Sequence, residues 1–434
     1  MIKALPPALR AYRMFSAAAR PVARLALTER ARRGKEHPER LGERRGIAGV
    51  KRPPGPLVWI HGASVGELVS VLPLIERISA RDLNVLVTSG TVTSSDVAAK
   101  RLPVGVIHQF APLDVPLYVR RFFHHWQPDL ALFVESDLWP NRIVEASRRR
   151  VPMILINGRL SENSYRRWRH LPAAITNLLQ RFDLCLARTP ADAERFGALG
   201  APRLITTGNI KFDVPAPSCH EGNLASLKRA IGERPVMAAA STHEGEESAI
   251  VAVHKQLAPN FPGLLTVIAP RHPERGPGIA DMIAAAGLKA RLRSRRQMPD
   301  AQTDIYVADT LGELGLIYRL APVVFIGGSL VRHGGQNPIE AAKLGAAIAH
   351  GPHLWNFAEV YAALDEARGA ELVSDESRLT GVLGMLLAHP TARERMATNA
   401  YNTVQDLGGA LERTLSSLEP YLLQLRLGRR TDHA

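Results

Sequence analysis

The chain has 434 residues, of which 46% are hydrophobic, 22% are charged and two are cysteines. This composition is that of an ordinary globular protein and excludes disordered and fibrous classes. The length suits two or three domains. The two thiols, Cys185 and Cys219, can form neither a disulfide framework nor a cysteine-rich zinc site, which fits a reducing compartment.

The formal net charge of +14 is concentrated at the N-terminus. Residues 1–52 contain 14 Lys or Arg and 4 Asp or Glu, a net charge of +10, which leaves +4 for the other 382 residues. A nucleic-acid enzyme usually spreads its basic surface over the folded body. The charge distribution therefore argues against nucleic acid as a partner.

The N-terminal segment, residues 1–52, has the pattern of a helix that lies in a membrane interface. Leu9, Tyr12 and Phe15 fall on one side of a helical wheel and arginines fall on another. A solvated basic arm explains the same residues equally well. No apolar run approaches the roughly 20 residues that span a bilayer. The following run, residues 30–46, is predicted to be too charged for a core.

From Pro56 onward, apolar strands alternate with amphipathic helices, which is typical of open parallel α/β sheets. A Pro- and Gly-containing linker, residues 214–223, separates two such series. We therefore expect a Rossmann-like domain at 53–213 and a second one at 224–434, whose last helices from about Ala358 are long enough to return to the first. The predicted strands are 57–63, 84–90, 105–111, 129–136, 152–158, 183–188, 203–209, 235–241, 264–270, 304–309, 322–329 and 346–351.

In such sheets ligands bind outside the carboxyl ends of strands. There, HGASVGE places Glu67 in the first turn of a helix, whose dipole would keep the carboxylate ionised as a general base requires. A plain helix-capping glutamate is the structural alternative. ESDLWPN ends an apolar strand with Glu135 and Asp137, and buried strands seldom end in two acids without a use for them. Two acids without a third ligand do not predict a metal site.

Basic side chains follow two further strands of the first series. GRLSENSYRRWRHL contains four arginines, and guanidinium groups suit phosphate or carboxylate ligands, although a solvated helix start is the alternative. GNIKFD places Lys211 just after a strand, where an ammonium group can neutralise a leaving phosphate.

The second series has two notable strand ends. APRHPER places Arg271 in a turn held by two prolines. GGSLVRHGGQNPIEAA is predicted to expose backbone N–H groups that hold an anion, with Asn337 as helix cap, Pro338 at the first position and Glu340 one turn in. No GxxxxGK[ST] motif is present, which disfavours a P-loop kinase or ATPase.

Taken together and in this order, HGASVGE, ESDLWPN, NGRLSENSY, GNIKFD, ASTHEGEE, PRHPER, GGSLVRHGGQNPIE and GPHLWNF resemble the motifs of the 3-deoxy-D-manno-oct-2-ulosonic acid (Kdo) transferases of lipopolysaccharide synthesis. The similarity extends from about Arg33 to past Phe357. It implies a GT-B fold, with two Rossmann-like domains facing a central cleft. It also implies transfer of Kdo from CMP-Kdo to a lipid A precursor of the lipid IVA type, with inversion and without a metal or cofactor.

The resemblance also implies roles for individual residues. Glu67 matches the catalytic base, while Glu135 and Lys211 match positions that assist the transition state. Arg159, Arg166, Arg167 and Trp168 are the candidates for acceptor binding. The positions that match the family's CMP-binding residues are Pro270, Arg271, Leu311, Gly312, Glu313, Asn337, Pro338, Ile339 and Glu340.

The N-terminal segment resembles the family's membrane anchor in place and charge, but its apolar run is shorter and more interrupted. We therefore expect peripheral attachment to the anionic cytoplasmic face of the inner membrane rather than a spanning helix. Two alternatives stay open: a UDP-sugar transferase or epimerase of the same fold, and a non-catalytic nucleic-acid-binding protein.

Overall fold

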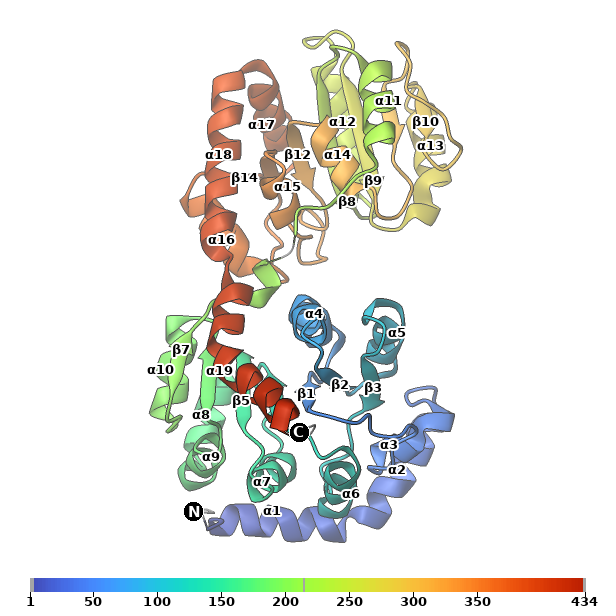
Figure 1. Ribbon diagram of the computed structural model, residues 1–434. Coiled ribbons are helices and arrows are strands. Elements are labelled where there is room, and N and C mark those ends of the chain that lie inside the picture. Colours follow the sequence, from blue (N-terminus) through green and yellow to red (C-terminus); the bar gives the residue numbers. More distant parts are fainter. Residues whose placement is uncertain (1–3, 214, 432–434) are drawn as a thin grey trace. The chain divides into compact units, whose positions relative to one another are not determined.

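The computed structural model describes residues 4–213 and 215–431 (Figure 1). The chain forms two compact units, one from the residues up to Asp213 together with those from Gly408 on, and one from residues 214–407. Each unit is an α/β structure around one parallel sheet of seven strands. This confirms the predicted fold class of two Rossmann-like domains.

The sheet of the first unit has the order β3-β2-β1-β4-β5-β6-β7, and all its strand pairs are parallel. Each of the seven predicted strands is confirmed, because strands covered on both faces are nearly continuous apolar runs. Successive strands are added in one direction from β1 to β3 and in the other direction from β4 on, so the topological switch point lies between β1 and β4. The strands are β1 Leu57–His61, β2 Asn84–Ser89, β3 Ile107–Phe110, β4 Leu130–Val134, β5 Met153–Gly158, β6 Leu184–Ala187 and β7 Leu204–Thr206.

Helices cover both faces of this sheet (Figure 1). Helices α4, α5 and α19 pack on one face, and α6, α7 and α9 pack on the other with α1 against α6 and α7. The helices are α1 Pro7–Ala18, α2 Arg20–Arg32, α3 Leu41–Arg44, α4 Val65–Ser79, α5 Val92–Arg101, α6 Pro116–Trp126, α7 Pro140–Arg148, α8 Glu162–Arg169, α9 Pro172–Leu179, α10 Pro190–Ala198 and α19 Ala410–Thr431, with short 3-10 turns η1 Pro38–Arg40 and η2 Ile210–Phe212.

The sheet of the second unit has the order β10-β11-β9-β8-β12-β13-β14, with its switch point between β8 and β12. The five predicted strands are confirmed, but the sequence analysis missed β10 and β14. Both are edge strands of three residues, too short to form an apolar run of their own. The strands are β8 Val236–Thr242, β9 Leu265–Pro270, β10 Ala290–Leu292, β11 Ile305–Val307, β12 Val323–Ile326, β13 Ala347–His350 and β14 Ala370–Leu372.

Helices α12, α13 and α17 share one apolar core on a face of this second sheet. On the other face α14 contacts β8 and α11, and α15 contacts α18. The helices are α11 Glu221–Ile231, α12 Glu246–Leu257, α13 Gly276–Ala285, α14 Leu314–Leu320, α15 Ile339–Lys343, α16 Ala358–Glu366, α17 Glu376–Ala388 and α18 Pro390–Leu407, with the turn η3 Pro273–Arg275.

The last helix, α19, belongs to the first unit, so the predicted extent of the second domain, 224–434, is wrong at its C-terminal end. Leu415, Leu418 and Leu422 of α19 are buried in the same apolar core as α4. Asp213 binds the start of this segment, since its carboxylate accepts hydrogen bonds from the Gly409 and Leu411 N–H groups. Burial of this leucine stripe explains why the chain returns.

The N-terminal segment also belongs to the first unit, and its charged run is not a solvated linker. Glu36 is 3% exposed, Glu43 is 8% exposed and Arg44 is 7% exposed, which contradicts the prediction that residues 30–46 lie outside the core. Arg44 pairs with Glu36 at 2.9 Å and donates to the Gly90 and Ala111 carbonyls. Because each buried charge has a partner, a highly charged run can be interior.

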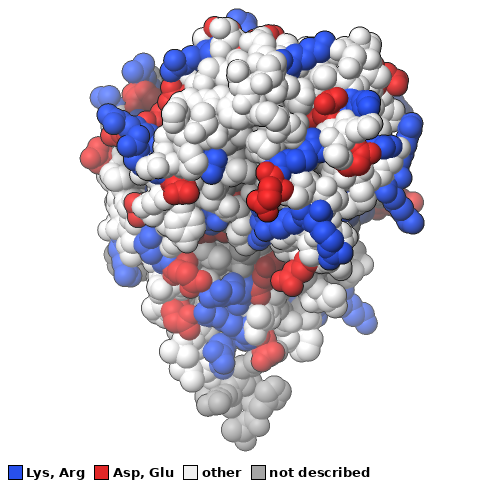
Figure 2. All heavy atoms as spheres, turned by 90° about the horizontal axis from the view of Figure 1, so that it is seen from above, with Lys and Arg blue, Asp and Glu red and all other residues white. Residues whose placement is uncertain are grey.

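Helix α1 places the predicted membrane-facing residues on two different sides. Leu9 is buried in the core, and the Tyr12 hydroxyl lies 3.0 Å from Asp114 Oδ2. Phe15, in contrast, is 75% exposed. Within residues 4–213 and 215–431, no helix is long and apolar enough to cross a membrane. On the face drawn in Figure 2, Lys and Arg side chains are scattered among Asp and Glu.

Candidate active site

The predicted catalytic residues of the first unit come together at its switch point. Strands β1 and β4 are neighbours, and the loops that follow their carboxyl ends carry Glu67, and Glu135 with Asp137, respectively. Lys211 lies in η2, which contacts α4. Open α/β sheets bind ligands at this place.

Glu67 is half-buried in the first turn of α4. Its backbone N–H donates to Ser64 Oγ at 3.2 Å, and its carboxylate accepts from the Ala63 N–H at 2.7 Å and from the Ser64 hydroxyl at 2.9 Å. The capping interpretation is therefore right, but it does not exclude a role as base, since each oxygen keeps a free lone pair. Burial raises the pKa of Glu67, the hydrogen bonds from Ala63 and Ser64 oppose this rise, and the nearby Glu135 and Asp137 add to it, so the net direction is upward.

Glu135 and Lys211 form an ion pair, with Lys211 Nζ 2.6 Å from Glu135 Oε1. Asn209 stabilises the 3-10 turn that carries Lys211, because its side-chain oxygen accepts a hydrogen bond from the Lys211 N–H. Glu135 has a φ of +59°, a left-handed conformation that is uncommon outside glycine and is often found at functional sites. The structure therefore brings together all three residues that the sequence assigned to catalysis.

The predicted acceptor-binding residues follow β5, which is the neighbour of β4. Arg159 is exposed directly after the strand, and Arg166 and Arg167 are exposed on α8. Arg166 Nε pairs with Glu162 at 3.0 Å. Trp168 is half-buried and packs against the apolar core. The arginines are therefore accessible to a ligand, whereas the indole contributes mainly to packing.

In the second unit the predicted donor residues lie in loops at the carboxyl ends of the strands. Arg271 is exposed just after β9, and its N–H donates to the Thr242 carbonyl at 2.9 Å. Leu311 is exposed, and Gly312 has a φ of +80°. The Glu313 carboxylate is paired with Arg293 at 2.7 Å, and this hydrogen-bonded pair lowers the pKa of Glu313. Arg293 thus fixes the loop.

The segment Asn337–Glu340 begins α15. Asn337 Oδ1 accepts from the Ile339 N–H at 3.0 Å, as a helix cap does, and Pro338 occupies the cap position itself rather than the first helical position. Burial raises the pKa of Glu340. A half-buried carboxylate at this place can accept hydrogen bonds from sugar hydroxyls.

Three N–H groups of the predicted glycine-rich anion site are occupied by an internal carboxylate. Glu246, the buried first residue of α12, accepts hydrogen bonds from the N–H groups of Gly328, Ser329 and Leu330 at 2.7 to 3.0 Å. The glycines make room for it, since a Cβ on Gly327 would lie 2.9 Å from Glu246 Oε2. These amides are therefore not available to a ligand.

Three histidines gather at the same strand ends. The rings of His243 and His333 stack with centroids 4.2 Å apart, and His272 lies edge-on to His243 at 6.0 Å. They follow β8, β12 and β9, which are adjacent in the sheet only after folding. Burial, then His333, His272 and Arg271, lower the pKa of His243, which favours the neutral imidazole.

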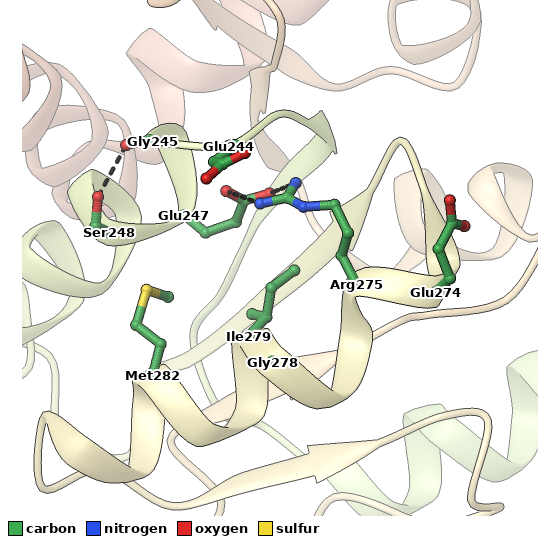
Figure 3. Close-up of a pocket in the computed structure, with 9 residues that line it drawn as sticks. All are labelled: Glu244, Gly245, Glu247, Ser248, Glu274, Arg275, Gly278, Ile279 and Met282. Atoms are coloured by element: carbon green, nitrogen blue, oxygen red, sulfur yellow. Dashed lines mark hydrogen bonds and ion pairs between the residues drawn. The ribbon is translucent and has the colours of Figure 1, made fainter.

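A pocket of about 430 Å³ lies beside this histidine cluster, between the starts of α12 and α13 (Figure 3). An ion pair between Arg275 and the buried Glu247, with a shortest distance of 2.6 Å, lines it. None of the predicted donor residues lines this pocket. Among the described residues, no three His, Cys, Asp or Glu side chains form a set that could hold a metal ion.

Comparison with known proteins agrees with the motif resemblance. Residues 38–214 match the family model described as 3-Deoxy-D-manno-octulosonic-acid transferase (kdotransferase). A probable mitochondrial 3-deoxy-D-manno-octulosonic acid transferase of Arabidopsis thaliana is 36% identical, covering 89% of this chain and 89% of that protein. The 3-deoxy-D-manno-octulosonic acid transferase of Haemophilus influenzae is 34% identical, covering 88% of this chain and 92% of that protein.

Solved structures resemble the chain in fold. A glycosyltransferase from Rickettsia africae matches with a TM-score of 0.54 at 10% identity, over 86% of this chain and 99% of that chain. A UDP-GlcNAc 2-epimerase from Neisseria meningitidis matches with a TM-score of 0.53 at 15% identity, over 84% of this chain and 100% of that chain. The fold alone thus does not separate transferases from epimerases. The identity of more than 30% to relatives over most of both chains does separate the two classes. It shows that this chain belongs to the 3-deoxy-D-manno-octulosonic acid transferase family of GT-B glycosyltransferases.

Proposed function

We propose that the chain is an inverting glycosyltransferase that moves Kdo from CMP-Kdo to a lipid A precursor of the lipid IVA type. The observation that carries this proposal is Glu67, a half-buried carboxylate of raised pKa at the switch point of the first unit, close to the Glu135–Lys211 pair. A carboxylate with a raised pKa is a better proton acceptor near neutral pH.

In the proposed reaction Glu67 removes the proton from a hydroxyl of the acceptor. The hydroxyl oxygen forms a bond to the anomeric carbon of Kdo while the bond from that carbon to the phosphate oxygen breaks, and the electron pair leaves with CMP. One displacement from the opposite face inverts the configuration. No metal or cofactor takes part.

The charge on the leaving phosphate needs donors other than the glycine-rich amides, which Glu246 occupies. Arg271 and the neighbouring imidazoles of His243 and His333 are the donors that the second unit offers near the predicted CMP positions. Charge-assisted hydrogen bonds of this kind stabilise a developing anion most strongly.

Release of CMP from CMP-Kdo tests the function against its alternatives. We expect release of CMP from CMP-Kdo to depend on added lipid acceptor. When a UDP-sugar replaces CMP-Kdo, we expect no release of UDP. Acceptor-independent conversion of a UDP-sugar would favour the epimerase alternative, and no turnover of either donor would favour a binding protein.

Arg271→Ala should weaken CMP binding about 10- to 100-fold, because it removes a charge-assisted hydrogen bond of about 1.5–3 kcal/mol. Isothermal titration calorimetry with CMP measures this. Arg229→Ala on α11, also exposed and in the same unit, serves as the control and should bind CMP normally. Equal affinity in both variants would remove Arg271 from the donor site.

The affinity for CMP should rise as the pH falls toward the lowered pKa of His243, and it should rise more steeply in the wild type than in His243→Asn. An anion stabilises an imidazolium, so the pKa of His243 is higher in the complex than in the free protein, and binding is favoured as the pH falls. The phosphate of CMP titrates in both cases, so the difference between the two slopes is the relevant quantity. Identical slopes would exclude His243 as a phosphate donor.

We further propose that α1 and α2 attach the enzyme to an anionic membrane surface. Met14, Phe15, Val22 and Leu25 are 66–75% exposed on these two helices, and Arg20 and Arg24 are exposed beside them. Apolar side chains flanked by basic ones suit insertion into a headgroup layer. This set replaces the predicted set, of which Leu9 is buried in the core.

Changing Met14, Phe15, Val22 and Leu25 together to Ser should release the protein from vesicles of anionic phospholipid, as measured by co-sedimentation at low salt. The wild type should bind, and should do so less at high salt. A control variant, Val104→Ser with Leu372→Ser, removes exposed apolar residues elsewhere and should bind like the wild type. Equal binding of both variants would place the membrane contact elsewhere.

A further inference from the structure

A buried cluster of His61, Asp137 and Arg142 connects the two loops of the candidate active site, and the reaction described above does not use it. His61, the last residue of β1, is 1% exposed, and Arg142 in the first turn of α7 is 5% exposed. His61 Nε2 lies 2.6 Å from Asp137 Oδ2 and 2.5 Å from Arg142 Nη1. Arg142 Nη1 is 3.6 Å from the same carboxylate oxygen.

Thr88 lies between Trp59 and His61 and contacts both rings. Trp59 Nε1–H donates to Thr88 Oγ1 at 2.8 Å, and the same oxygen lies 2.8 Å from His61 Nδ1. A proton on His61 Nε2 can be donated to the Asp137 carboxylate, and Nδ1 can then accept from the Thr88 hydroxyl. Burial, and after it the charge of Arg142, lower the pKa of His61, so the ring is neutral.

Asp137 is therefore an ionised carboxylate that contacts two buried side chains, His61 and Arg142. Burial alone would raise its pKa, but the hydrogen bond with His61 and the charge of Arg142 hold the pKa of Asp137 below its usual value. Arg142 is itself anchored, since Nη2 donates to the Pro112 carbonyl at 2.8 Å and its backbone N–H donates to Asp114 Oδ1.

This arrangement has two consequences for Glu67 and Glu135. It pins the β4–α7 loop, in which Glu135 has its left-handed backbone, to the end of β1, from which the Glu67 loop departs. It also keeps a negative charge close to the base. The groups that face the Glu67 carboxylate are the Ala63 N–H, the Ser64 hydroxyl, Glu135 and Asp137, and both acids raise the pKa of Glu67.

We propose that Asp137, held by His61 and Arg142, is a positioning residue that fixes the loop of Glu135 and supplies a negative charge that strengthens Glu67 as a base. The proposal rests on the proposed function, because it requires Glu67 to be the base. It gives a role to Asp137, the second acid of ESDLWPN, and to His61, the histidine of HGASVGE.

The test is the pH dependence of kcat/KM in the full-length protein for three variants. Asp137→Asn keeps the shape and removes the charge, so kcat should fall about 10- to 100-fold and the acidic limb should move to lower pH. Asp137→Glu keeps the negative charge, so the acidic limb of its kcat/KM profile should stay closer to that of the wild type. Asp129→Asn removes a carboxylate at the other end of β4, where it accepts from the Leu57 N–H, and should leave the limb unmoved.

If the acidic limb of the kcat/KM profile of Asp137→Asn coincides with that of the wild type, the electrostatic role is overturned. If kcat of Asp137→Asn is unchanged, the positioning role is overturned. If Asp137→Asn fails to fold, as judged by CMP binding and urea unfolding, His61→Leu carries the test. That variant keeps the Asp137 charge and loses its partner, so kcat should fall with the limb unmoved, and a normal kcat would refute the proposal. Full activity of Glu67→Gln would instead refute the proposed function.

Discussion

Glu67→Gln should lower turnover about 10²- to 10⁴-fold, because the amide keeps the shape of the side chain but cannot accept a proton. CMP affinity should be unchanged, since the predicted donor residues lie in the other unit. Initial rates of CMP release with saturating acceptor measure the loss. In the wild type the rate should fall as the pH drops through the pKa of Glu67, which burial raises above the usual value of a glutamate.

The matched control is Glu76→Gln, an exposed glutamate on the same helix, which should retain full activity. A Glu67→Gln variant with near-normal turnover would show that Glu67 only caps α4. In that case the hydrogen bonds from Ala63 and Ser64 would be the whole explanation of its position.

Arg44→Leu should lower the free energy of unfolding by about 3–5 kcal/mol, because it leaves Glu36 buried without one of its partners. Arg44 also satisfies the Gly90 and Ala111 carbonyls at the ends of β2 and β3, which the leucine cannot do. Urea unfolding followed by circular dichroism measures the change. Arg32→Leu, an exposed position of the same segment, should change stability by about 0.5 kcal/mol or less.

Equal urea midpoints for Arg44→Leu and the wild type would mean that residues 30–46 do not contribute to the fold. The predicted result means instead that deleting the N-terminal segment destabilises the first unit. For this reason surface substitutions on α1 and α2 test membrane attachment more cleanly than a truncation does.

The sequence predicts the strands well because a strand covered on both faces, such as LVWIH at 57–61, is apolar throughout. It also places Glu67, Glu135 and Arg271 correctly, because strand ends share one edge of a parallel sheet whatever the details of packing. The edge strands Ala290–Leu292 and Ala370–Leu372 leave no comparable signal.

The errors have a common physical cause, which is a partner distant in the sequence. The glycine-rich amides look free until folding brings Glu246 to them, from a position 82 residues before Gly328. The charge of Arg44 looks solvated until Glu36 and the carbonyls at the ends of β2 and β3 surround it. The stacking of His243 and His333 likewise depends on the adjacency of β8 and β12.

Mass spectrometry of the product formed from CMP-Kdo and a defined tetraacyl lipid A precursor tests the central claim most directly. The account predicts a lipid whose mass has increased by one or more Kdo residues, formed with one CMP per residue added, and formed about 10²- to 10⁴-fold more slowly by Glu67→Gln. An unmodified lipid beside free Kdo and CMP, or a lipid modified only when a UDP-sugar replaces CMP-Kdo, would contradict it.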